Sequence, residues 1–218
     1  MDPAPHIWPP NLQASLPSGP VPMFPLGGLF LFPGQILPLH IFEPRYVQLI
    51  EDSLDGPGRL VIGTILEGHG NGSGDPPPVL PVCGLGEIAR HQKQPDGRFV
   101  IWLFGVARVR IDEVPSDRLY RKVVCSEFSE VNPSSQELEC LQGPLVDAIR
   151  SRIKLPISAK LISIVQLADI LAQCLAIPQS RKEEIYTEAK VAVRVERLLA
   201  AHNEFPPPPA TDQLHSEQ

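Results

Sequence analysis

The sequence predicts an α+β fold in which a small β-barrel with one helix is followed by an α-helical bundle. Up to about residue 130, short apolar runs alternate with Gly and Pro, which is typical of bent strands that close into a barrel. From residue 134 onward, apolar residues recur at three- and four-residue spacing behind capping signals, which is typical of amphipathic helices. A chain of 218 residues with 43% hydrophobic content can bury such a core without disulfides.

Composition divides the chain into four segments. Many of the 26 prolines lie in the tails, at residues 3–22 and 206–209, and in one loop at residues 76–78, where their fixed φ and missing N–H cost nothing. We therefore expect a disordered Pro-rich tail over 1–20, a β-barrel domain over 21–130, a helical bundle over 131–204 and a disordered tail over 205–218.

The barrel domain is expected to contain a series of short strands, closed or nearly closed so that few edges remain. The strands are predicted over 21–26, 35–40, 59–66, 80–90, 98–104, 106–114 and 120–128. Pro44 can begin the single helix, because its missing N–H is harmless in a first turn. Pro95-Asp96-Gly97 has the composition of a hairpin turn.

Capping signals predict the helices of the second half. Ser134 with Glu137 and Ser180 with Glu183 have the spacing of capping boxes, and Ser158 can cap a helix between them. Gly143-Pro144 should bend or restart the first of these helices.

Residues 37–46 read LPLHIFEPRY, after an opening Met23-Phe24-Pro25-Leu26 and a further Leu31-Phe32-Pro33-Gly34. This stretch resembles the start of the LON substrate-binding domain, the N-terminal module of LON proteases, which also occurs as a standalone protein. Two weaker likenesses follow, at residues 95–111 and in the final helix at residues 195–199. The resemblance covers about residues 21–203 and implies a PUA-like β pseudo-barrel followed by a helical bundle.

The resemblance implies a standalone, non-catalytic module that recognises protein segments, either unfolded chains or partner polypeptides. Its partners would be protein or peptide clients, with a protease as one candidate. The sequence has no G-x-x-x-x-G-K-[ST] loop for ATP phosphates, and it shows no peptidase module. We therefore expect no catalytic residues, no cofactor and no metal.

Two places are candidates for protein binding. Phe30, Leu31 and Phe32 lie in a loop between two strands; exposed, they would form an apolar recognition patch, whereas buried they would plug the end of the barrel. Glu43, Arg45 and Tyr46 form a strand-to-helix corner. They either stabilise the helix start or bind extended client segments.

The alternative function is RNA binding, which rests on analogy with PUA-like barrels and on Arg108 and Arg110 on one face of a strand. The net charge of −6 argues against a phosphate-backbone binder, so nucleic acid is an unlikely partner. An enzyme would require a pocket that joins His40, Glu43 and Arg45. The G-x-G-x-x-A pattern at residues 84–89 is better explained as a strand than as a dinucleotide-binding turn.

The remaining features predict a cytoplasmic protein without a membrane segment. Four cysteines occur without a C-x-x-C pair, which favours free thiols in a reducing compartment. The N-terminus lacks the basic and apolar regions of a signal peptide. The most apolar long segment, at residues 161–177, is too short and too polar to span a bilayer.

Overall fold

The computed structural model describes residues 16–69, 76–153 and 162–207. It divides into two compact units, one formed by residues 1–131 with 179–189 and the other by residues 132–178 with 190–218. Most of the two tails predicted to be disordered, and the predicted cap Ser158, lie outside the described residues.

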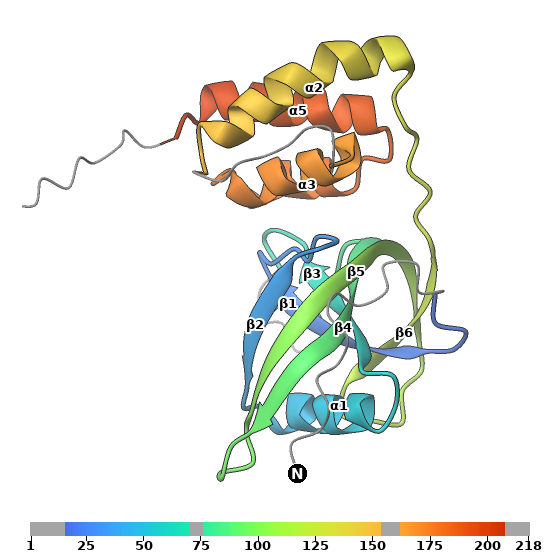
Figure 1. Ribbon diagram of the computed structural model, residues 1–218. Coiled ribbons are helices and arrows are strands. Elements are labelled where there is room, and N and C mark those ends of the chain that lie inside the picture. Colours follow the sequence, from blue (N-terminus) through green and yellow to red (C-terminus); the bar gives the residue numbers. More distant parts are fainter. Residues whose placement is uncertain (1–15, 70–75, 154–161, 208–218) are drawn as a thin grey trace, which may run out of the picture. The chain divides into compact units, whose positions relative to one another are not determined.

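Five strands of the first unit close into a ring. They are β1 (Val21–Gly27), β3 (Arg59–Ile65), β4 (Val82–Lys93), β5 (Phe99–Val114) and β6 (Arg121–Glu127), paired in the order β1-β3-β4-β5-β6 and back to β1. β1 and β3 run parallel, and the other neighbours run antiparallel. A further strand, β2 (Ile36–Ile41), is added beside β5, and Figure 1 shows β2, β5 and β4 next to one another. The predicted α+β class and barrel closure are confirmed.

The long strand β5 pairs with two different strands, β2 and β6, along the same edge. Its first half, up to Phe104, pairs with β2, and its second half, from Val109, pairs with β6. The sequence predicted two strands separated at Gly105, but β5 continues through this residue. A Cβ at Gly105 would collide with the backbone carbonyl of Phe32, so glycine is needed here for close approach of the Phe32 loop.

The helix α1 (Pro44–Leu54) packs its apolar face against the barrel core. Pro44 occupies the first turn, as predicted. Tyr46, Leu49 and Ile50 are buried in one cluster with inward-facing residues of the strands. The strand members of this cluster are Phe24, Ile41, Leu60, Ile62, Phe99, Ile101 and Leu103.

A short helix from the second half of the sequence, α4 (Gln179–Tyr186), belongs to the barrel unit. The sequence placed it in the helical bundle, with Ser180 and Glu183 as a capping box. Instead, Glu183 accepts hydrogen bonds from the Glu67 amide and the Gln179 side chain, both at 2.8 Å. The Gln179 amide group also donates to the Ile65 carbonyl at 2.7 Å. These contacts with the end of β3 explain why the helix leaves the bundle.

The second unit is built from α2 (Ser135–Arg150), α3 (Ile164–Cys174) and α5 (Val191–Glu204), which pack against one another. The predicted capping box of Ser134 and Glu137 is present, and hydrogen bonds from Ser134 lower the pKa of the Glu137 carboxyl. α2 runs through Pro144, which is exposed, so the predicted restart of the helix at this residue does not occur. No described helix is long and apolar enough to cross a membrane.

Candidate functional site

The loop residues Phe30, Leu31 and Phe32 are buried. The rings of Phe30 and Phe32 lie 5.3 Å and 5.1 Å from the ring of Tyr186 on α4, measured between centroids. The Tyr186 hydroxyl donates a hydrogen bond of 2.7 Å to the Leu31 carbonyl. Of the two alternatives for this loop, the structure therefore shows the buried one, because α4 covers the three side chains, and they do not form an exposed apolar patch.

The strand-to-helix corner places Glu43 at the N-cap position of α1. Its carboxylate accepts hydrogen bonds from Nε and Nη2 of Arg45, at 2.9 Å and 2.7 Å, and makes no side-chain cap bond to the helix. The Arg45 guanidinium lies 4.5 Å from the centroid of the Tyr46 ring. Tyr46 itself is buried against Phe24, and this burial raises the pKa of its hydroxyl. Glu43 and Arg45 are therefore accessible to a partner, whereas Tyr46 supports the core.

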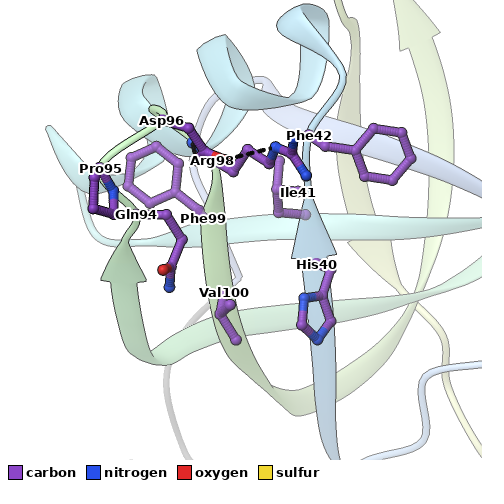
Figure 2. A pocket seen from close by; sticks show the side chains of 9 residues that line it. All are labelled: His40, Ile41, Phe42, Gln94, Pro95, Asp96, Arg98, Phe99 and Val100. Atoms are coloured by element: carbon purple, nitrogen blue, oxygen red, sulfur yellow. Dashed lines mark hydrogen bonds and ion pairs between the residues drawn. The ribbon is translucent and has the colours of Figure 1, made fainter.

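An open hollow of about 610 Å³ lies next to this corner, and we call it the hairpin hollow. One wall is the end of β2, and the other is the turn between β4 and β5 (Figure 2). Its lining residues are His40, Ile41, Phe42, Gln94, Pro95, Asp96, Arg98, Phe99 and Val100. The predicted turn at Pro95-Asp96-Gly97 is confirmed: Gln94 and Arg98 close it by a backbone bond of 2.7 Å.

Phe42 is an exposed aromatic residue of the hollow, with 64% of its surface accessible. Figure 2 shows its ring directed away from the strands, while His40 and Val100 lie side by side on β2 and β5. Phe42 is not among the candidate residues predicted from the sequence. Strand alternation could have found it, because it lies two residues after the exposed His40 and next to the buried Ile41.

The outer face of β2, β5 and β4 continues from the hollow as a mixed apolar and basic surface. Pro38, Trp102 and Arg90 are cross-strand neighbours in one row, and His40 and Val100 occupy the next row. Cross-strand neighbours share one face of a sheet. The Arg90 guanidinium lies 5.0 Å from the Trp102 ring centroid, and both residues are at least partly exposed.

Three catalytic arrangements considered from the sequence do not form among the described residues. Residues 84–89 lie within β4, so the G-x-G-x-x-A pattern does not open a helix as a dinucleotide site requires. His40 lines the hairpin hollow, but Glu43 and Arg45 do not. No group of three or more potential metal ligands occurs among the residues with described positions.

The basic face proposed for RNA is reduced to one exposed arginine. Arg110 is exposed, but only 2% of the Arg108 side chain is accessible. Arg108 donates to the Glu130 carboxylate at 2.5 Å and lies over the rings of Phe128 and Tyr186. It is therefore a structural residue of the barrel unit.

The fold and the corner motif define the class of protein. Residues 20–202 match the family described as ATP-dependent protease La (LON) substrate-binding domain. The match covers most of the chain, so the protein belongs to this family, and the resemblance carried by residues 37–46 is confirmed.

Sequence relatives agree with this assignment. Lon protease of Desulforamulus reducens is 25% identical over 190 residues, which are 82% of this chain and 23% of the relative. Lon protease of Azorhizobium caulinodans is 27% identical over 192 residues, 82% of this chain and 22% of the relative. The chain therefore spans about a quarter of the length of these curated relatives.

Two solved structures share the fold. The N-terminal domain of a Lon protease from the Mycobacterium avium complex superposes with a TM-score of 0.66 at 15% identity, covering 85% of this chain and 99% of that one. A Lon N-terminal domain protein from Xanthomonas campestris gives a TM-score of 0.61 at 22% identity, covering 84% and 98%.

Proposed function

We propose that this chain is a non-catalytic module that binds segments of other polypeptides. The observation that carries the proposal is the family match over residues 20–202, because the matching family is described as a substrate-binding domain. The clients are unfolded or partner proteins, and a protease that acts on them is one candidate partner. The module itself leaves its clients uncleaved.

The surface that best supports this function is the hairpin hollow with Phe42 at its rim. It combines an exposed aromatic ring with an open concave wall, a usual arrangement for apolar side chains of a bound segment. Glu43 directly follows Phe42, and Arg45 lies two residues further on; both would contact the polar part of the same segment. This placement replaces the buried loop at Phe30–Phe32 as the main contact surface.

The test uses a chain that exists in folded and unfolded forms. Reduced, carboxymethylated α-lactalbumin is labelled, and its binding to the full protein is measured by fluorescence anisotropy beside that of native α-lactalbumin. We expect binding of the unfolded form, no cleavage of the probe, and an affinity at least about fivefold weaker for Phe42→Ser because an apolar contact is lost.

The matched control is Leu119→Ser. Leu119 is 66% exposed, as accessible as Phe42, but it does not line the hollow. It should bind the probe like the wild type. Equal binding of native and unfolded probe would contradict the proposal, and so would salt-sensitive capture of structured RNA without capture of the unfolded chain.

A further inference from the structure

The strand β2 forms one edge of the sheet. The sheet order begins with β2, and within the described residues this strand pairs only with β5. The side chains of Ile36, Pro38 and His40 are exposed, whereas Leu37 and Leu39 pack against the core cluster. No described strand is therefore paired with the long side of β2 that faces away from β5, which we call the open edge.

Alternate residues of β2 direct their backbone N–H and C=O groups toward β5 and away from it. This alternation determines which groups lie on the open edge. The Gly105 amide donates to the Gln35 carbonyl at 2.8 Å, so residue 35 faces β5. Residues of an antiparallel strand alternate between facing the partner and facing away. Leu37, Leu39 and Ile41 therefore bond β5, while the N–H and C=O groups of residues 36, 38 and 40 point to the open side.

Pro38 agrees with this alternation, because a proline facing β5 would interrupt the ladder. The open edge therefore offers amide donors at Ile36 and His40, about 13 Å apart by strand geometry. Between them, Pro38 supplies a carbonyl acceptor alone. An extended polypeptide backbone carries donors and acceptors at the matching repeat, whereas a nucleic acid or a small molecule does not.

We propose that the open edge of β2 binds an extended segment of a partner polypeptide by β-strand addition. This inference rests on the proposed function and specifies its binding mode. His40 links the two parts of the surface, because its backbone belongs to the edge while its side chain lines the hairpin hollow. A segment paired with the edge lies on the side of β2 to which the Phe42 ring is directed, away from the turn residues of the hollow (Figure 2).

Pro38 reduces the number of hydrogen bonds that the open edge can form with a further strand, but it does not prevent pairing. Natural sheets protect exposed edges with proline and charged side chains against pairing with further copies. β2 has a proline at the centre of its open side but no Asp, Glu, Lys or Arg at residue 36, 38 or 40. The open edge can therefore bind a short segment, which loses one hydrogen bond because Pro38 has no N–H. Edge-to-edge pairing with further copies of the sheet is disfavoured.

The test begins with an array of twelve-residue peptides tiled over the α-lactalbumin sequence. The tightest binder is resynthesised with single N-methyl groups at each position, which removes one backbone donor at a time. Strand addition predicts binding about tenfold weaker at alternate positions and little change between them, since one hydrogen bond is lost in each sensitive case. This measurement needs no protein variant.

Two variants test the protein side. His40→Pro removes the outward amide while leaving the bonds to β5, and His40→Val removes the same imidazole but keeps the amide. We expect about tenfold weaker peptide binding for His40→Pro relative to His40→Val, with similar thermal unfolding. A flat N-methyl profile with equal binding of the two variants would overturn strand addition and leave the proposed function intact.

Two further outcomes are decisive. If no peptide and no unfolded chain binds the wild type, both the proposed function and the strand-addition mode are wrong. If the wild type forms a dimer that His40→Pro abolishes, as measured by sedimentation, a second copy of this chain occupies the edge and the partner-segment assignment is overturned.

Discussion

The hydroxyl of Tyr186 donates a hydrogen bond of 2.7 Å to the backbone carbonyl of Leu31, a residue 155 positions earlier in the chain. Both residues are buried, and the Tyr186 ring also contacts Phe30 and Phe32. The barrel unit is therefore completed by a helix that is encoded between two helices of the other unit. The Tyr186 side chain thus helps to bury the Phe30–Phe32 loop, which also packs against the backbone of β4 and β5 at Gly84 and Gly105.

Substituting Tyr186→Phe should destabilise the barrel unit by about 1–2 kcal/mol, because the buried Leu31 carbonyl loses its donor. Urea unfolding followed by the fluorescence of Trp102, in a Trp8→Phe background, measures this change. Tyr120→Phe is the control: its hydroxyl donates to Asp52 at 2.7 Å, and Asp52 keeps Arg118 as a partner at 3.3 Å when this bond is lost. If the free energy of unfolding falls equally in the two variants, the hydrogen bond to Leu31 does not stabilise the protein more than the one to Asp52.

Close approach of the same loop to β5 gives a second prediction. Gly105→Ala should cost about 3 kcal/mol, because the added Cβ collides with the Phe32 carbonyl and backbone must move. Gly27→Ala is the matched control in β1, where a Cβ meets no atom within 4 Å. It should change the free energy of unfolding by less than about 0.5 kcal/mol. A tolerated alanine at Gly105 would contradict the described packing of the loop.

The barrel elements could be predicted from local sequence signals. Pro44 in a first helical turn and Pro95-Asp96-Gly97 between two strands each act through their immediate neighbours. The place of α4 could not be predicted in this way. Its attachment depends on Gln179 and Glu183 meeting Ile65 and Glu67, which are far away in the sequence.

At the candidate site, too, features set by local sequence could be predicted, whereas those set by long-range contacts could not. The family motif located the corner at Glu43 and Arg45, and both are accessible in the structure. Burial of Phe30 and Phe32 depends on α4, so their apolar character alone could not distinguish a patch from a plug. The burial of Arg108 likewise depends on Glu130 and Tyr186, which strand alternation does not include.

The four thiols should differ in reactivity. Burial raises the pKa of Cys83 to about 12 and that of Cys125 to about 11, so both stay protonated and shielded at pH 8. Cys140 is exposed and should react first with Ellman's reagent. Cys140→Ser should remove the fast phase, while Cys83 and Cys125 react only in urea. Rapid labelling of Cys83 in the folded protein would contradict its burial.

These raised pKa values also make stability depend on alkaline pH. The folded state holds both thiol protons more tightly than the unfolded state, whose thiols titrate near 9. The resulting stability is fully present below about pH 9 and is lost as the pH rises toward 11–12. Between pH 8 and 10.5 the urea midpoint should fall further in the wild type than in a Cys83→Ala/Cys125→Ala variant. If the urea midpoint falls equally in both proteins, groups other than these two thiols cause the loss of stability at alkaline pH.

The ion pair between Arg108 and Glu130 anchors the segment that leaves β6. Glu130→Gln should destabilise the barrel unit by about 2 kcal/mol, because the almost fully buried guanidinium loses its charged partner. The figure lies below that for a fully buried pair, since 24% of the Glu130 side chain is accessible. Glu127→Gln, at an exposed position of β6, should leave the urea midpoint unchanged. If both variants unfold at the wild-type midpoint, Arg108 is stabilised by its aromatic neighbours Phe128 and Tyr186 instead.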